Sequence, residues 1–275
     1  MRDVVVIGSG GQLGQCVRAL DEEWTFLTSN DLDLRDPDNV EMFFSSEKPK
    51  VILNLAAYTA VDKAEEETDL AMAINSESSE ALANSCQYYF YVSTDYVFDG
   101  KSDKPYPEDH PTSPINDYGK SKLLGEKAAL EANPNSFIIR TSWLYSEFGN
   151  NFLKTMLRLG PEKEELSIVN DQIGSPTYAG DLAVALVQMV NEVEQHPPGI
   201  YHFANTGQCS WFDFAKEIFS QAEIDVKLNG IPTTEYPTPA KRPMWSVLDT
   251  DKIQKELNIS IPSWQSSLQK CLAEL

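Results

Sequence analysis

The sequence predicts an α/β fold, a doubly wound, Rossmann-like parallel sheet followed by a smaller C-terminal domain. Two observations predict it. Short β-branched or aromatic runs alternate with helical stretches through the first half of the 275 residues, and this rhythm changes after about Trp143. We therefore expect a first domain at residues 1–145, to which the chain returns at about 178–205. A second domain is expected mostly from residues 146–275.

The expected strands share continuous apolar runs, which are typical of parallel strands buried on both faces. They are residues 4–7, 25–27, 51–55, 88–93, 137–139 and, late in the chain, 200–203. Helices are expected at 12–20, from the capping residue Asp36 and Pro37 onward, and at about 116–131, 151–159 and 179–193. Four prolines between Pro232 and Pro243 favour an extended surface segment.

The composition narrows the classes of function. The chain has 42 acidic and 22 basic residues and a formal net charge of -20, which disfavours nonspecific binding to nucleic acid or to an anionic membrane. No apolar run approaches the roughly 20 residues of a membrane span, and none has the form of a signal peptide. The four cysteines share no short spacing, so we expect reduced thiols in the cytoplasm and no disulfide framework or metal site.

A glycine-rich turn follows the first expected strand and opens the first helix. Gly8, Gly11 and Gly14 form the pattern G-x-x-G-x-x-G, which permits a tight turn and close approach of the backbone to a pyrophosphate. The first domain is therefore predicted to bind a dinucleotide. The second strand ends in TSND at residues 28–31, with Asp31 one step beyond the position that selects NADH and no adjacent arginine to select NADPH. The motif does not choose between them.

Tyr118 and Lys122 stand four residues apart at the start of a long helix, so both project from one face. A nearby ammonium group lowers the pKa of a phenol and suits it to acid–base chemistry, and the same lysine can reach the ribose of a cofactor. Thr94 follows Ser93 at the end of the fourth strand, where its hydroxyl can donate to a developing oxyanion. Each feature alone has a structural explanation, but together with the glycine turn they predict an enzyme.

These motifs resemble those of the extended short-chain dehydrogenase/reductases, and more narrowly those of the dTDP-4-dehydrorhamnose reductase family. The similarity extends over nearly the whole chain. It rests on residues 8–14, 56–65, 93–100, 118–126, 140–145, 150–152, 170–177 and 237–243.

The resemblance implies reduction of dTDP-4-dehydro-L-rhamnose to dTDP-L-rhamnose, with hydride transfer from NADPH or NADH to C4 of the sugar. It implies that Tyr118 is the proton donor, Lys122 its partner and ribose ligand, and Thr94 the hydroxyl that orients the carbonyl. Besides Tyr118 and Lys122, cofactor contacts are implied at Gly8, Gly11, Gln12, Leu13, Gly14, Asp33, Leu34, Ala57, Tyr58 and Thr59. Substrate contacts are implied at Val61, Thr94, Asp95 and Trp143.

Several alternatives stay open. The Arg242 guanidinium suits a diphosphate, and a surface ion pair would suit it equally. Trp143 and Val61 would also serve as packing residues. A nucleotide-sugar epimerase or dehydratase is the first rival, but the dehydratases resembled here carry Asp-Glu after the threonine, and this chain has Tyr96 in the second place. The second rival is a binding protein such as the regulatory subunit of methionine adenosyltransferase, which has no need of the Tyr–Lys spacing.

The chain departs from the family pattern in two places. Members that dimerise through Mg²⁺ carry a glutamate just after the glycine loop, where this chain has Gln15 and Cys16, so we expect a monomer and no metal. Between Asn75 and Thr94 the chain is about one helical turn shorter than the family pattern, so the helix there should end early, near Cys86.

Overall fold

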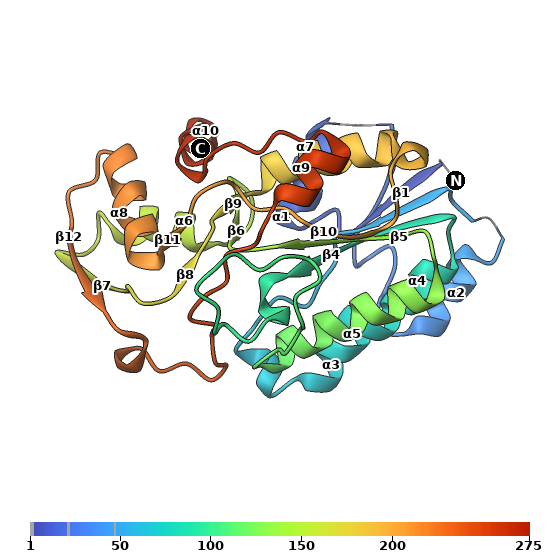
Figure 1. Cartoon of the computed structure of the whole chain (residues 1–275), viewed down its shortest axis with the longest axis horizontal. Helices are drawn as coiled ribbons and strands as arrows, with labels where there is room; N and C mark the ends of the chain where they lie inside the picture. The colour runs from blue at the N-terminus through green and yellow to red at the C-terminus, as the bar shows by residue number, and fades with distance from the viewer. Residues whose placement is uncertain (1–2, 21–22, 47) are drawn as a thin grey trace.

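A six-stranded parallel sheet forms the centre of the larger lobe of the molecule (Figure 1). The computed structural model describes residues 3–20, 23–46 and 48–275. The strands run in the order β10-β5-β4-β3-β1-β2, and every neighbouring pair is parallel, which confirms the expected fold class. They are β1 (Val4–Ile7), β2 (Thr25–Leu27), β3 (Val51–Asn54), β4 (Tyr88–Thr94), β5 (Ser136–Thr141) and β10 (Gly199–His202).

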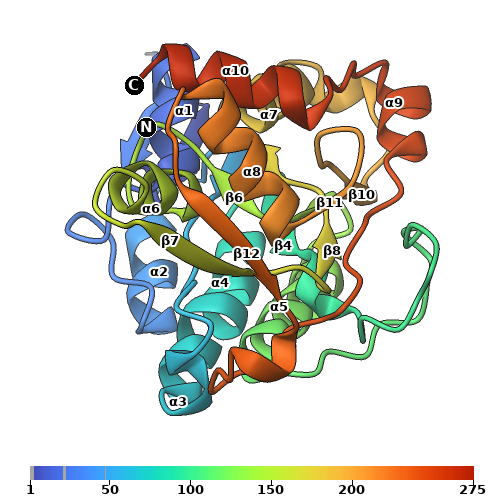
Figure 2. The same ribbon diagram turned by 90° about the vertical axis from the view of Figure 1, so that its left-hand side faces the viewer.

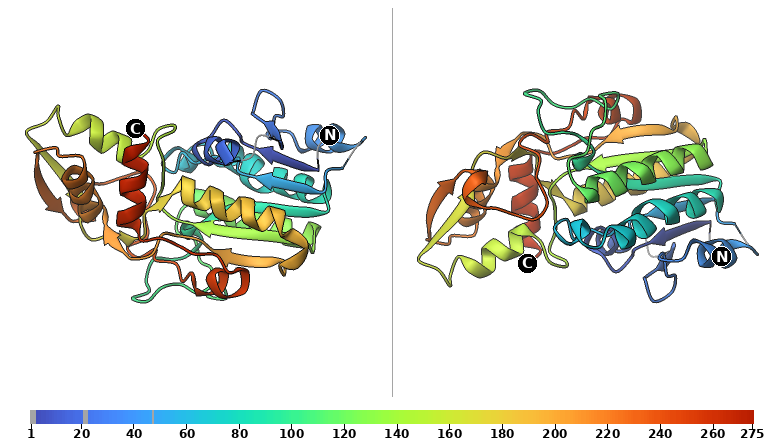
Figure 3. Two further views of the ribbon diagram at one scale, coloured as in Figure 1. Left: turned by 90° about the horizontal axis from the view of Figure 1, so that it is seen from above. Right: turned by 90° about the horizontal axis from the view of Figure 1, so that it is seen from below.

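Helices cover both faces of the sheet (Figure 3). One face carries α1 (Gln12–Leu20), α7 (Ala179–Asn191) and α9 (Asp251–Leu257), and the other α2 (Pro37–Phe44), α4 (Ser78–Asn84) and α5 (Asp117–Ala132). The core is divided in the same way, because successive strand residues point to opposite faces. In β1, Val6 packs on the α1–α7 side, whereas Val5 and Ile7 pack on the α2–α4 side.

Local signals in the sequence set several helix ends. Asp36 caps α2 and Asn116 caps α5, each side chain accepting from a backbone N–H of the first turn. The helix before β4 consists of α3 (Thr68–Met72), a π turn (Ala73–Glu77) and α4. It ends at Asn84, close to the early end expected near Cys86.

The chain leaves the sheet after β5 and returns to it late. After the excursion, α7 packs on α1, and β10 pairs with β5 so that His202 lies opposite Arg140. The returning segment therefore supplies a covering helix of one face and an edge strand of the sheet.

The remaining elements form a smaller lobe beyond the carboxyl ends of the strands (Figure 2). Its helices are α6 (Phe152–Leu159), α8 (Trp211–Gln221) and α10 (Trp264–Ala273). Its strands pair as β7 (Glu165–Val169) with β12 (Lys227–Ile231), β8 (Ile173–Gly174) with β11 (Cys209–Ser210), and β6 (Leu144–Tyr145) with β9 (Thr177–Tyr178). Phe214 and Trp264 meet edge to face in its core, 5.8 Å between ring centroids.

The proline-rich segment 232–243 is only partly the extended surface segment that the sequence predicts. A 3₁₀ turn at Thr233–Glu235 opens it, and Ala240 and Pro243 are buried. A Cβ added to Gly100 would lie 2.6 Å from Pro243, so the end of the segment packs against the loop that follows β4.

Candidate active site

The glycine turn forms a tight cradle at the N-terminus of α1. Gly8 has a φ of 80°, and a Cβ there would lie 2.5 Å from the backbone nitrogen of Ala56. A Cβ on Gly14 would lie 2.5 Å from the carbonyl oxygen of Gly8, while Gly11 closes the turn by donating its N–H to that oxygen (3.0 Å). Only glycine fits at positions 8 and 14. The cradle suits a pyrophosphate, which needs close backbone approach at a helix N-terminus.

The two residues inside this turn have different surroundings. Oε1 of Gln12 accepts from Nδ2 of Asn151 (2.8 Å) and from the hydroxyl of Ser146 (3.2 Å). Leu13 is buried in the core between the sheet and α7. Leu13 therefore offers a dinucleotide only its backbone, and Gln12 ties the glycine turn to the start of α6 in the smaller lobe.

The two residues expected at the adenine also differ. Asp33 forms an ion pair with Arg35, with 2.5 Å between Oδ2 and Nη2, and this pairing lowers the pKa of Asp33 to about 2. Leu34 is buried on the α2 side of the core. Asp33 is the more exposed of the two, and its carboxylate already has a partner.

Three expected cofactor contacts, Ala57, Tyr58 and Thr59, follow β3 and are held in place by a residue that the sequence did not reveal. The backbone N–H of Tyr58 donates to Oδ1 of Asn75 (2.8 Å), and Nδ2 of Asn75 donates to the carbonyl oxygen of Tyr58 (3.2 Å). The same amide donates to the hydroxyl of Ser121 on α5 (2.9 Å). Asn75 lies fully buried in the π turn. It fixes the exit of β3 relative to α5.

Thr94 and Tyr118 meet at the carboxyl end of β4. The side chain of Thr94 acts on the pKa of the Tyr118 hydroxyl, so the two groups are neighbours, and Oγ1 of Thr94 donates to Oδ1 of Asp95 (3.0 Å). Burial raises the pKa of Tyr118 to about 12 and that of Asp95 to about 7, although hydrogen bonds to both groups act in the opposite direction. Tyr118 is therefore a phenol at neutral pH, the form that can donate a proton.

Lys122 lies one turn along α5 from Tyr118, but its ammonium group is turned into the protein. Nζ donates to the carbonyl oxygen of Val92 (2.7 Å) and lies 3.9 Å from the centre of the Tyr91 ring. Burial lowers the pKa of Lys122 to about 7, opposed by the charge of Glu126. Burial dominates the pKa of both groups in this arrangement, and the lowering of the Tyr118 pKa by Lys122 stays a prediction.

A buried ion pair lies next to Lys122 in the core of this region. Arg140 donates from Nε and Nη2 to the carboxylate of Glu126 (2.9 and 2.7 Å), and the hydroxyl of Ser93 donates to the same carboxylate (2.5 Å). Both charged side chains are 2% exposed. The pair connects α5 to β4 and β5. The signal available in the sequence was the charge of Arg140 at the end of an otherwise apolar strand.

Trp143 is held in a strained backbone conformation on the side of the smaller lobe. Its φ is 48°, in the left-handed region that bulky residues rarely adopt. Its ring stacks on that of Trp211, with 3.6 Å between centroids, and a Cβ on Gly174 would lie 2.5 Å from it. Trp143 and Val61 are both half-buried rather than core residues.

Arg242 forms the ion pair that the sequence leaves as an alternative. Nη1 and Nη2 donate to the two carboxylate oxygens of Asp62 (2.8 and 2.7 Å). Burial raises the pKa of Tyr96, and the charge of Arg242 acts in the opposite direction. The ring of Tyr96 packs edge-on against that of Tyr118 at 5.8 Å. The pair therefore borders the same site as Thr94 and Tyr118. The sequence does not indicate that Asp62 pairs with Arg242, since acidic residues are common just before a helix.

Within residues 3–20, 23–46 and 48–275, no group of three or more His, Cys, Asp or Glu side chains is placed to hold a metal ion. Cys16, which with Gln15 occupies the region where the glutamate of a Mg²⁺-bridged dimer would lie, is buried, and burial raises the pKa of its thiol to about 12. Over the same ranges, no helix has both the length and the apolar character needed to cross a membrane.

Comparison with known proteins identifies the family. The RmlD substrate binding domain family matches residues 1–275. The dTDP-4-dehydrorhamnose reductase of Escherichia coli (strain K12) is 41% identical over 292 residues, which cover 99% of this chain and 98% of the relative. The spore coat polysaccharide biosynthesis protein SpsK of Bacillus subtilis (strain 168) is 41% identical over 283 residues, covering 100% and 98%.

Solved structures agree. The crystal structure of dTDP-4-dehydrorhamnose reductase from Bacillus anthracis in complex with NADP superimposes with a TM-score of 0.93 at 41% identity, covering 100% of this chain and 99% of that one. The expected resemblance is confirmed: the chain belongs to the RmlD substrate binding domain family, which includes the dTDP-4-dehydrorhamnose reductases.

Proposed function

We propose that this protein reduces the 4-keto group of dTDP-4-dehydro-L-rhamnose to give dTDP-L-rhamnose, with NADPH or NADH as the reductant. The observation that carries the proposal is the hydroxyl pair of Thr94 and Tyr118 at the carboxyl edge of the sheet. Ligands of open parallel sheets bind at that edge, and the glycine cradle that suits a pyrophosphate opens at the same edge. The reductases among the relatives named above support the choice of substrate.

When bound, a reduced nicotinamide supplies the hydride that adds to C4 of the sugar. The hydroxyl of Thr94 orients the C4 carbonyl, and Tyr118 donates its proton to O4 as negative charge develops there. Because burial keeps the pKa of Tyr118 near 12, the donor is protonated at neutral pH. Lys122, one turn away, stabilises the phenolate that the transfer leaves and binds the cofactor ribose.

The cofactor lies, in this proposal, on the lobe formed by residues 1–145 and 178–205. The backbone of the glycine turn binds its pyrophosphate, the loop of Asp33 and Leu34 flanks its adenine, and the segment fixed by Asn75 contacts its nicotinamide half. Residues 146–275 serve mostly to bind the nucleotide sugar. From the first domain, Val61, Asp95 and Trp143 border the sugar. We further propose a cytoplasmic monomer, because Gln15 and Cys16 occupy the region where a Mg²⁺-bridged dimer needs a glutamate.

The test is oxidation of NADPH and NADH at 340 nm with enzymatically generated dTDP-4-dehydro-L-rhamnose. Turnover with that substrate supports the proposal. A protein that binds nucleotide by calorimetry but turns over no such substrate would overturn the substrate assignment, and would favour a different keto sugar or a regulatory role. NAD that copurifies with the protein and gives its own absorbance would favour an epimerase, which recycles its cofactor.

A further inference from the structure

The last three residues of β4 extend past the end of the neighbouring strand β3. β4 pairs with β3 over Tyr88–Tyr91, opposite Val51–Asn54, whereas its pairing with β5 continues to Thr94. Thr94 therefore lies at the end of a segment that β3 does not support. A hydroxyl that orients a substrate has to be held closely, because misplacing a reacting group by 1 Å can slow a reaction about 100-fold.

One face of α5 makes contacts with this segment. Tyr118, Lys122 and Glu126 are spaced four residues apart, so they lie on the same face of the helix. Nζ of Lys122 donates to the carbonyl oxygen of Val92 (2.7 Å), and the hydroxyl of Ser93 donates to Oε1 of Glu126 (2.5 Å). The two residues that precede the orienting threonine are thus each bonded to α5.

The side chain of Ser93 points to the α5 side of the sheet. Tyr89 and Tyr91 pack in the core on that side, and alternate residues of a strand share a face, which agrees with the bond from Ser93 to Glu126. Thr94 follows directly and keeps an extended backbone, with φ of -141° and ψ of 154°. Fixing Ser93 on α5 therefore also fixes the direction in which the Thr94 hydroxyl leaves the strand.

The carboxylate that holds Ser93 is itself fixed. Arg140 lies opposite Ser93 on β5 and donates from Nε to Oε1 of Glu126 (2.9 Å) and from Nη2 to Oε2 (2.7 Å). Nη1 of Arg140 donates to the carbonyl oxygen of Glu108 (3.3 Å) and lies 3.4 Å from Nε2 of His202. A buried carboxylate bound in this bidentate way has little freedom to turn.

We propose that Ser93 is a positioning residue, anchored by the Glu126–Arg140 pair, which aims the Thr94 hydroxyl at the sugar carbonyl beside Tyr118. This inference rests on the proposed function. A buried ion pair adds little stability over apolar residues of the same volume. What this pair supplies is an acceptor at a fixed place, which holds the Ser93 side chain in one orientation.

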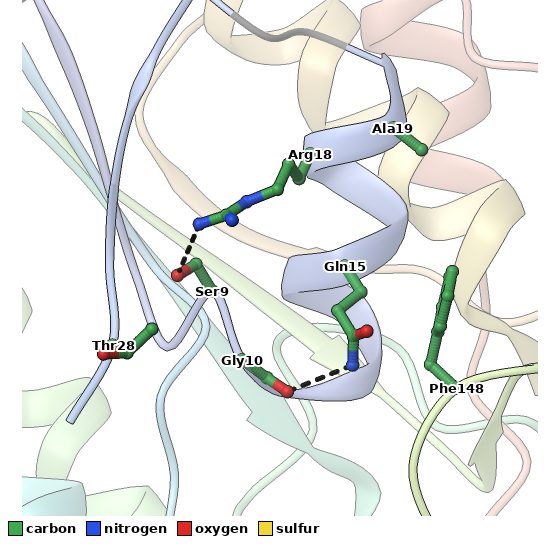
Figure 4. A pocket seen from close by; sticks show the side chains of 7 residues that line it. All are labelled: Ser9, Gly10, Gln15, Arg18, Ala19, Thr28 and Phe148. Atoms are coloured by element: carbon green, nitrogen blue, oxygen red, sulfur yellow. Dashed lines mark hydrogen bonds between the residues drawn. The ribbon is translucent and has the colours of Figure 1, made fainter. Parts of the chain in front are cut away.

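A second serine, which is paired with an arginine, shows the difference (Figure 4). The hydroxyl of Ser9 accepts from Nη2 of Arg18 (3.3 Å), and Arg18 is exposed. Water can replace such a bond at little cost. Ser93 makes a shorter bond to a buried carboxylate, so breaking it would leave a polar group unpaired in the core.

The test is a double-mutant cycle on kcat, in which Ser93→Ala and Thr94→Ala are measured singly and together. Absorbance at 340 nm gives the rates with saturating cofactor and enzymatically generated dTDP-4-dehydro-L-rhamnose. We expect Ser93→Ala alone to lower kcat about 10- to 100-fold, with cofactor affinity by calorimetry little changed. In the Thr94→Ala background it should lower kcat no further, because Ser93 acts through Thr94. A loss of the same size in both backgrounds would overturn the inference.

Ser136→Ala is the matched control. The Ser136 hydroxyl also joins the sheet to α5, since it donates to the carbonyl oxygen of Ala129 (2.9 Å), but it lies at the far end of β5. The control should lower the free energy of unfolding and leave kcat unchanged. An equal fall of kcat in Ser136→Ala and Ser93→Ala would overturn the inference, because it would mean that any loosening of α5 slows the reaction.

Ser93→Cys keeps the test valid if Ser93→Ala does not fold. Its thiol is a weak donor, so we expect kcat between those of Ser93→Ala and the wild type, and the same cycle can be run with it. Equal kcat for Ser93→Cys, Ser93→Ala and the wild type would overturn the positioning role while the reductase proposal stood. A wild type that turns over no substrate would overturn the proposed function and this inference with it.

Discussion

The Asp62 carboxylate and the Arg242 guanidinium form a bidentate ion pair that joins the segment after β3 to the end of the proline-rich segment, 180 positions later in the chain. The backbone N–H of Ala240 donates to the same carboxylate (3.1 Å). Arg242 is only 22% exposed in its side chain and borders Tyr96. The pair therefore holds a cation beside the candidate substrate site, where a diphosphate would compete with Asp62 for it.

Variants of the two partners should act in opposite directions if Arg242 binds the diphosphate. Arg242→Gln removes charge-assisted hydrogen bonds, so we expect KM for the nucleotide sugar to rise by about 10- to 100-fold. Asp62→Asn leaves the guanidinium free for the substrate, so KM should fall. Initial rates at varied sugar concentration measure both. A rise in KM of similar size in the two variants would mean that the pair is a structural clamp, and Lys227→Gln at the exposed pair with Glu165 is the control.

Tyr118→Phe should slow the chemical step without weakening cofactor binding. The variant keeps the ring that packs against Tyr96 but has no proton to donate, so we expect kcat to fall about 10²- to 10⁴-fold with cofactor affinity little changed. Absorbance at 340 nm gives the rate and calorimetry gives the affinity. Tyr96→Phe, which removes the neighbouring hydroxyl, is the matched control. Full activity of Tyr118→Phe would disprove its role as proton donor.

The raised pKa of Asp95 predicts that ionisation of this side chain destabilises the folded protein as the pH rises. Burial raises its pKa from the ordinary value near 4 to about 7, so the folded protein binds one more proton than the unfolded chain between those pH values. The contribution of Asp95 to the free energy of unfolding must therefore decrease as the pH rises from about 4 to about 7. Asp95→Asn keeps an acceptor for Thr94 and removes the charge. The variant should be more stable than the wild type above pH 7, by at most about 4 kcal/mol.

Denaturant unfolding at pH 4, 6 and 8 measures this difference. The stabilisation should grow across that series and be smallest at pH 4, where Asp95 is protonated in the folded state and only about half ionised in the unfolded chain. A difference that does not change with pH would contradict the raised pKa. The same variant should lose turnover if Asp95 borders the sugar, so stability and activity would change in opposite directions.

Glu126→Gln should destabilise the protein strongly. It leaves the buried guanidinium of Arg140 without its counter-charge, and breaking a buried pair in this way costs about 3–5 kcal/mol. Chemical denaturation measures the loss. Glu162→Gln, which breaks an exposed pair with Arg158 (3.6 Å), should cost about 1 kcal/mol or less and provides the comparison. An equal loss of stability in the two variants would contradict the argument that burial makes the Glu126–Arg140 pair the more important one.

The fold could be predicted from the sequence where local patterns are strong. The apolar run of β1, the glycine turn and the Asp36 cap of α2 lie within one residue of their expected positions. The strand pairs of the smaller lobe were not predicted, because strands of two to five residues carry almost no periodicity. Their register depends on pairing partners far away in the chain.

The candidate site, too, could be predicted from the sequence only in part. Spacing alone placed Tyr118 and Lys122 on one helix, but it could not show that burial would turn the Lys122 ammonium toward Val92. Side chains such as Asn75 and Asp62 act through partners 17 and 180 positions away. Nothing local in the sequence distinguishes them from ordinary loop residues, so only the folded chain reveals them.

The late return of the chain to the sheet sets how this molecule could be recombined with its relatives. A chimera that exchanges everything after residue 145 would also replace α7 and β10, and so the partner that β5 needs on its outer edge. A clean exchange of the smaller lobe needs two junctions, before and after the returning segment. A nascent chain faces the same constraint, since the parallel sheet is complete only after His202 has been synthesised.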